Sequence, residues 1–226
     1  GVPRIAWRCA IIKLLLSAME ETQESKGTYV FLNVAYYGLV ICGMVATAAD
    51  PSLNKTLMAA VGESFSDGPL APVWDAYSSQ RVLQAAALTI AVNLVVGSFA
   101  TITLPSLIVP FSGLLIAVVR ALLWGVLFSP RSVTGIGLVE AVAGLSIAVL
   151  VFLEGQGYVL AALGAYLHGV AFLFPRSTGA DGHLQGYWGG VKTQARIYVL
   201  VLVVLLIAAL YEVVIAVFAL PALLAP

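Results

Sequence analysis

Charged residues are scarce in this sequence: only 10% of its 226 residues are Asp, Glu, Lys or Arg, against about 25% in soluble domains. Hydrophobic residues make up 61%. One core cannot hide so many apolar side chains from water, so the composition excludes a soluble globular protein and predicts lipid as the solvent. Eleven basic residues balance eleven acidic ones, so no concentrated basic face for nucleic acid is expected.

Cysteine and histidine are also rare. The two cysteines, Cys9 and Cys42, do not indicate a disulfide framework. Only His168 and His183 are available as strong haem or metal ligands, so we expect neither a metal site nor a cofactor.

Motifs of soluble enzymes are missing too: the sequence has no H-E-x-x-H, phosphate loop, C-x-x-C or G-x-S-x-G. The nearest catalytic pattern joins Ser112 with His168, as in the serine and histidine helices of rhomboid-type intramembrane proteases. Pro110 stands where that family's motif has glycine. We therefore expect a protein that is not an enzyme.

Long apolar runs dominate what remains, and about 20 apolar residues suffice for one helical crossing. The pattern predicts an all-α integral membrane protein, a bundle of about six transmembrane or partly re-entrant helices plus interfacial amphipathic helices. The run over 135–174 is twice the length of a crossing, so we place a break at Glu154-Gly155-Gln156-Gly157. A second break is expected at Leu104-Pro105-Ser106. The predicted spans are 29–49, 83–103, 107–128, 135–153, 158–174 and 197–220.

Two segments are too polar to cross. Residues 1–28 form an amphipathic amino-terminal segment, expected to lie along the interface or to pack on the rest of the protein. Residues 50–82 form an amphipathic surface loop, in which Asp50-Pro51 predicts a helix start and Trp74 and Tyr77 suit the membrane interface. A single transmembrane domain over 29–226 follows. Basic residues near the start predict a multi-pass protein of the cell membrane with a cytoplasmic amino terminus.

Polar groups inside spans are costly, so each is a candidate for function. Arg120 and Glu140 are interpreted either as a buried ion pair that fixes helix order or as part of a polar path. Glu154 either faces water at its glycine-rich break or joins that path. Glu212 carries the same ambiguity, and Asn93 is suited to a hydrogen bond across helices. The candidate intramembrane polar site is therefore Arg120, Glu140, Glu154, Glu212 and Asn93.

Small residues form two stripes at helical spacing. Gly137, Ala141, Gly144 and Ala148 lie on one face, and Ala161, Ala165 and Gly169 on another. Such faces let helices approach closely in lipid. They predict that the segments 135–153 and 158–174 pack as a hairpin.

Three short motifs follow one another along the chain. They are an Asn in one span, then Phe111-Ser112-Gly113-Leu114-Leu115, and then Gly137-Leu138-Val139-Glu140. Over about Asn93 to His168 this set resembles the stage II sporulation protein M family of polytopic membrane proteins. That family usually shows Asn-Gly at Ser112-Gly113 and Pro-His-Gly-x-x-Glu at the second motif, where Ile136 replaces the His. Glu154 with the residues 158–162 is an alternative carrier of the second motif.

The resemblance implies a non-enzymatic membrane scaffold, because the namesake recruits peptidoglycan hydrolases during engulfment in spore-forming bacteria. The first hypothesis is therefore a scaffold or accessory subunit of a larger membrane complex. Its expected partners are the lipid bilayer and other membrane subunits or a second copy of the chain. The alternative is a transporter or channel-like protein with a polar site around Arg120, Glu140 and Glu154.

Overall fold

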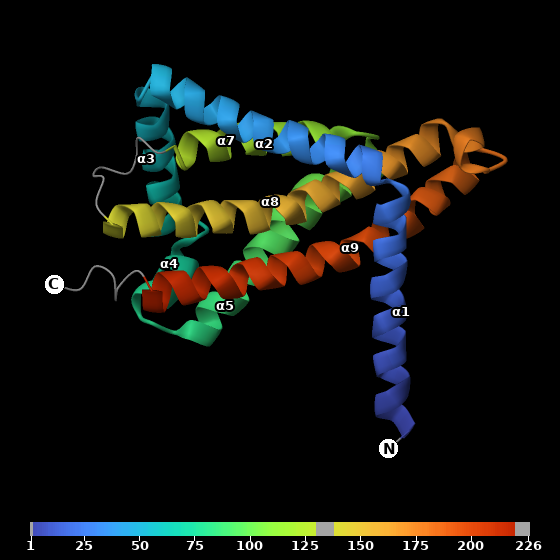
Figure 1. The fold of residues 1–226 in the computed structure, drawn as a ribbon, viewed down its shortest axis with the longest axis horizontal. Coiled ribbons are helices and arrows are strands. Elements are labelled where there is room, and N and C mark those ends of the chain that lie inside the picture. The colour runs from blue at the N-terminus through green and yellow to red at the C-terminus, as the bar shows by residue number, and fades with distance from the viewer. Residues whose placement is uncertain (1, 130–137, 220–226) are drawn as a thin grey trace. The chain divides into compact units, whose positions relative to one another are not determined.

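The computed structural model describes residues 2–129 and 138–219, with side chains over 12–129 and 141–219, and most of these residues are helical. No strand occurs in these ranges (Figure 1). The elements are α1 (Val2–Glu24), α2 (Lys26–Ala49), α3 (Ser52–Ser66), α4 (Ala71–Ser78), α5 (Val82–Ile90), the π-helical η1 (Ala91–Thr103), α6 (Leu104–Ile108), α7 (Ser112–Leu127), α8 (Leu138–Leu173), the short 3₁₀ turn η3 (Pro175–Thr178), α9 (His183–Val214) and the π-helical η4 (Ile215–Ala219).

Four of the described helical stretches are long and apolar enough to cross a membrane. The helical class is thus confirmed for the described residues, and four helices are suited to cross a membrane, whereas six spans are not confirmed. A fifth apolar helix, Ser112–Leu127, has 16 residues and is shorter than the others. The four candidate spans are Lys26–Ala49, Val82–Ile108, Ala141–Leu173 and His183–Ala219.

The predicted break at 154–157 is wrong, because α8 is one helix of 36 residues. The predicted hairpin of 135–153 and 158–174 is therefore wrong as well. A Cβ added at Gly155 would lie 2.7 Å from the hydroxyl of Tyr37. Gly155 thus makes room for a neighbouring side chain, and the backbone keeps the helical hydrogen bonds that lipid cannot replace.

Two further boundaries differ from the expectation. The helix continues through Pro105 to Ile108, and the chain turns at Val109 and Phe111 instead. Phe111 has a φ of 67°, a strained value for a bulky side chain. The last span begins not at 197 but at His183, so most of the polar stretch between the predicted spans 158–174 and 197–220 is helical.

The first small-residue stripe does not face protein within the described residues. Ala141 and Ala148 are exposed, and nothing lies within 4 Å of a Cβ added at Gly144. Small residues in the second stripe, by contrast, are in the core: Ala161 and Ala165 are buried. The prediction that small residues mark a closely packed helix face is therefore correct only for the second half of α8.

The chain divides into two compact units, each described here by itself. The first comprises 1–35, 96–117 and 156–204, and its core is the second half of α8, with Tyr158 and Leu163 fully buried. The start of α9 packs on this half: a Cβ at Gly190 would lie 2.8 Å from the Cα of His168. In Figure 1, α1 leaves the start of α2 crosswise.

The second unit comprises 36–95, 118–155 and 205–226. Here α2 and α7 touch backbone to backbone, since a Cβ at either Gly43 or Gly125 would lie 2.9 Å from the other glycine's Cα. Asn54 of α3 donates to the carbonyls of Val126 and Leu127 at 2.8 and 3.0 Å, which caps the end of α7. Ala76, Ala85, Val213 and Val217 form a core that joins α4, α5, α9 and η4.

The predicted amphipathic segment is present as α3 and α4. The Asp50 carboxylate accepts a hydrogen bond from the backbone N–H of Ser52 at 3.0 Å, as the Asp50-Pro51 start predicts. Hydrogen bonding to Ser52 lowers the pKa of Asp50 below its ordinary value. The charged form that stabilises this helix start is therefore kept at neutral pH.

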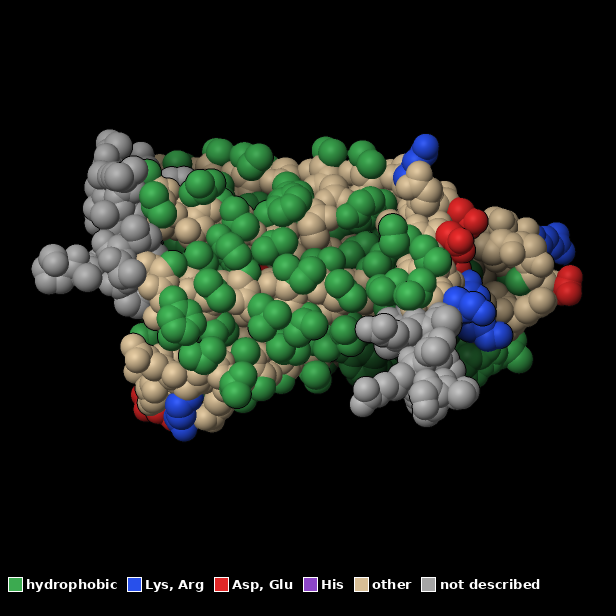
Figure 2. Space-filling model, turned by 60° about the horizontal axis from the view of Figure 1, so that its bottom comes forward, with side chains coloured by type: hydrophobic (Ala, Val, Ile, Leu, Met, Phe, Trp, Pro, Cys, Tyr) green, Lys and Arg blue, Asp and Glu red, His purple; other side chains and the backbone are tan. Residues whose placement is uncertain are grey.

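Large hydrophobic side chains are exposed along the candidate spans, with Phe31 at 69%, Leu83 at 86% and Leu145 at 68%. In Figure 2 hydrophobic side chains lie along the whole length of the visible face, and charged side chains form small separate groups. Soluble monomers avoid such a surface. It is the surface expected of helices that contact lipid.

Candidate functional site

Glu154 is the most buried charged residue among the described side chains, with 6% of its surface exposed. It lies on α8, and its carboxylate accepts a hydrogen bond from the Asn93 amide on η1 at 2.7 Å. The prediction that Glu154 faces water at a helix break is wrong, because there is no break. A π-helical stretch of this kind is rare and is often found at functional sites.

Glu212 of α9 lies next to Glu154 of α8, near enough for the two carboxyl groups to interact. An ionised carboxylate has no proton to donate. A hydrogen bond between two carboxyl groups therefore requires that one of them be protonated. The arrangement therefore suits a pair of carboxyl groups that shares one proton.

Tyr77 of α4 extends this network beyond the spans. Its hydroxyl donates to the Glu212 carboxyl and lies 2.9 Å from the hydroxyl oxygen of Thr89 on α5. Thr89 is buried. A continuous chain of polar groups thus runs from Asn93 through both glutamates to Tyr77 and Thr89.

Arg120 of α7 supplies the positive charge next to this chain, since it interacts electrostatically with Glu154. Both residues also interact electrostatically with Tyr36 on α2. The Tyr36 hydroxyl is buried without a hydrogen-bond partner. We call Asn93, Glu154, Glu212, Tyr77 and Arg120 the acidic site. All its members belong to the second compact unit.

The structure therefore brings together four of the five residues singled out from the sequence: Asn93, Arg120, Glu154 and Glu212. Glu140, the expected partner of Arg120, has a side chain outside the described residues. Tyr77 was expected only as an interfacial aromatic, because its partner Glu212 is far away in the sequence. A phenol on an amphipathic helix gives no signal that it will meet a buried acid.

A cavity of about 730 Å³ opens beside the acidic site. Glu212 and Tyr77 are among its polar lining residues, and the other lining residues come from α3, α4 and η4. Its volume lies within the range of about 300–1,000 Å³ that is usual for small-molecule sites. The lining includes Met58, Val61, Phe65, Val73, Trp74 and Ala216.

Burial raises the pKa of Tyr77 above its ordinary value, and the negative charge of Glu212 raises it further. The phenol of an unfolded chain ionises near pH 10. We therefore expect this residue's contribution to stability to be complete below about pH 10 and to be lost as the pH rises further. Spectrophotometric titration should show that Tyr77→Phe removes a phenolate that forms only well above pH 10. Loss of a phenolate forming near pH 10 would contradict this.

A second set of polar groups is buried in the first unit. The Ser112 hydroxyl and the side-chain amide of Gln194 are buried without a hydrogen-bond partner, and the buried His168 ring interacts with the backbone of Ser106. Ser112 is thus not hydrogen-bonded to His168, as activation of a serine nucleophile requires. The His168 ring instead packs edge to face on Tyr187, with ring centroids 5.0 Å apart.

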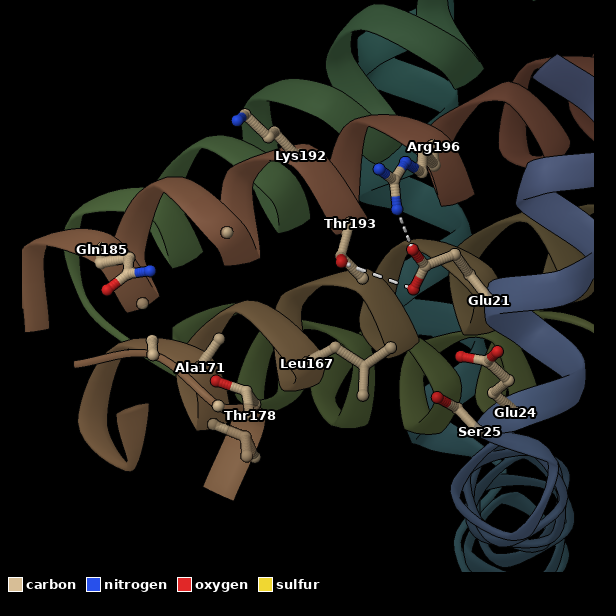
Figure 3. Close-up of a pocket in the computed structure, with 15 residues that line it drawn as sticks. Glu21, Glu24, Ser25, Leu167, Ala171, Thr178, Gln185, Lys192, Thr193 and Arg196 are labelled. Carbon is tan, nitrogen blue, oxygen red and sulfur yellow. Dashed lines mark hydrogen bonds and ion pairs between the residues drawn. The ribbon is translucent and has the colours of Figure 1, made fainter. Parts of the chain in front are cut away.

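A cavity of about 500 Å³ in the first unit is lined by charges of both signs (Figure 3). The Arg196 guanidinium of α9 pairs with the Glu21 carboxylate of α1, and the Thr193 hydroxyl donates to the same carboxylate at 3.4 Å. These contacts tie α1 to α9. This cavity is separate from the one beside the acidic site, because Glu212 does not line it.

No group of three or more His, Cys, Asp or Glu side chains able to hold a metal ion occurs within 12–129 and 141–219. What the acidic site offers chemically is a pair of carboxyl groups with donors around them. No protein-family model matches this sequence, and searches of curated proteins and of solved structures find no significant similarity.

Proposed function

We propose that this chain is a multi-pass membrane transporter that takes up and releases a proton at the Glu154–Glu212 pair. The observation that supports it most is that these two carboxyl groups, from α8 and α9, meet inside apolar helices. Ionisable groups in spans are rare and commonly mark ion and proton pathways. A pair that shares one proton is a proton site by its chemistry.

Access supports the same proposal. Glu212 and Tyr77 line the 730 Å³ cavity, whereas Glu154 is buried behind them. A proton that leaves the pair therefore has a route through the Tyr77 hydroxyl to the cavity. A purely structural ion pair needs no such opening.

Under the scaffold hypothesis from the sequence, these polar groups would be paired at helix contacts, where they only fix helix order, or would face a partner subunit. Nothing in its favour goes beyond exposed apolar surface, which lipid contact explains equally well. The resemblance to the stage II sporulation protein M family stays a prediction, as does the cytoplasmic amino terminus. A partner complex recovered at constant stoichiometry in mild detergent would favour the scaffold instead.

The test is proton movement into liposomes that contain the purified protein and a trapped pH-sensitive dye, with a potassium diffusion potential as driving force. We expect the wild-type protein to acidify the lumen and both Glu154→Gln and Glu212→Gln to reduce the flux to that of protein-free liposomes. Gln keeps the size and the hydrogen bonds but holds no exchangeable acid proton. Glu63→Gln, on the exposed face of α3, is the matched control and should transport normally.

An equal proton flux in the wild-type protein and in the two site variants would contradict the proposal. Infrared spectroscopy checks the site independently, because a protonated carboxyl group has its own carbonyl band. That band should be present in the wild-type protein at neutral pH and absent from both glutamine variants.

A further inference from the structure

The cavity beside the acidic site combines an apolar wall with one acid. Carbon-rich side chains of α3 and α4 form most of its lining, and Glu212 is the only charged residue among the lining residues. No Lys or Arg of the described part of the chain lines it. An anionic ligand would therefore find no counter-charge on the described lining and, once the pair has lost its proton, would meet a net negative charge.

Two aromatic residues, Trp74 and Phe65, line the cavity and could contact a bound cation. Trp74, on α4, is 60% exposed, and Phe65, on α3, is partly buried. Both line the cavity together with the phenol of Tyr77. The faces of such rings attract positive charge, most strongly for Trp. An amphipathic cation thus finds both an apolar wall and a ring face here.

The charges of the acidic site decide when the cavity attracts a cation. Glu154 and Glu212 face each other, Arg120 is next to Glu154, and Tyr77 and Asn93 are neutral donors. With one proton on the pair, the site is neutral overall. Loss of that proton leaves one net negative charge, which a bound cation neutralises.

We propose that the cavity binds a lipophilic organic cation, such as a hydrophobic amine or phosphonium, in exchange for the proton of the Glu154–Glu212 pair. The proposal rests on the proton site proposed above and names its second ligand. The cation places its charge at the Glu212 carboxylate and its apolar groups against Phe65 and Trp74. One proton leaves the site for each cation bound, so the charge of the site is conserved. Without the cation, the pair still takes up and releases its proton.

The experiment measures binding of tetraphenylphosphonium to the full chain in detergent, with tetraphenylmethane as a neutral probe of the same shape. We expect saturable binding of the cation only, tighter at higher pH, with one proton released per cation. Glu212→Gln should abolish binding. Trp74→Ala should weaken it about two- to fivefold, as loss of one exposed cation–π contact predicts.

Trp188→Ala is the matched control, since Trp188 is similarly exposed at 56% but does not line the cavity. It should bind the cation as the wild-type protein does. Trp74→Ala leaves the hydrogen bonds of the acidic site in place, so it tests the cavity even if Glu212→Gln fails to fold. Equal binding of the neutral probe, or binding unchanged in Trp74→Ala, would overturn the proposal.

The two proposals can fail separately. Proton flux in liposomes without cation binding would leave the proton site standing and overturn the organic cation. Cation binding at Trp74 with no proton released and no proton flux would overturn the exchange and the proton site, and leave an apolar cavity that binds cations at Glu212.

Discussion

Glu154→Leu is expected to lower the free energy of unfolding by about 3–5 kcal/mol, the usual cost of removing one partner from a buried charged pair. The substitution leaves the Asn93 amide without its acceptor at 2.7 Å and Glu212 without its carboxyl partner. Arg120 loses the carboxylate next to it. Denaturant titration in detergent, followed by tryptophan fluorescence, measures the change.

Two companion variants show whether the loss comes from unpaired polar groups. Glu154→Gln retains an oxygen for Asn93 and gains an amide that donates to Glu212, so it should lose much less stability. The double variant Glu154→Leu/Glu212→Leu removes both acids and should be more stable than Glu154→Leu alone. If Leu and Gln at position 154 are equally destabilising, the hydrogen-bonded pair is not what stabilises this region.

Gly125→Leu is expected to be the most damaging substitution on α7. A Cβ at this position would run into the backbone carbonyl of Val40 and lie 2.9 Å from the Cα of Gly43. Backbone atoms cannot rotate away from the added side chain as a flexible side chain can, so α2 and α7 must move apart. Overpacking usually costs about 1–3 kcal/mol, and more where relief is impossible.

Gly38→Leu is the matched control on α2, because nothing lies within 4 Å of a Cβ added there. Thermal unfolding in detergent should show a large drop in midpoint for Gly125→Leu and Gly43→Leu and almost none for Gly38→Leu. A similar drop in all three would mean that helix propensity, and not the contact between α2 and α7, decides the loss.

Gly155 shows why the structural role of a glycine cannot be predicted from the neighbouring sequence alone. The glycines at 155 and 157 predict a break by their local preference, yet α8 passes through them without interruption. Gly155 is needed because Tyr37 lies 2.7 Å from where its Cβ would be. Local preference describes one segment, whereas this role depends on a residue more than a hundred positions away.

The members of the acidic site could be predicted more readily than their partners. Asn93, Arg120, Glu154 and Glu212 each stand out because they are polar within an apolar run. The sequence favoured Arg120 with Glu140, however, and offered no partner for Glu212. The structure instead places Glu212 against Glu154 and Tyr77, two residues on other helices.

The sequence alone determined the solvent of this protein, its helical class and which few polar groups must be accommodated among apolar residues. Those properties follow from composition and from periodicity within one segment, which need no knowledge of neighbours. Only the tertiary structure decided that Asn93 meets Glu154 across 61 positions, and that Tyr77 and Glu212 line one cavity. Proton sharing and ligand binding depend on distances of a few ångströms between helices, and such distances arise only when the helices pack.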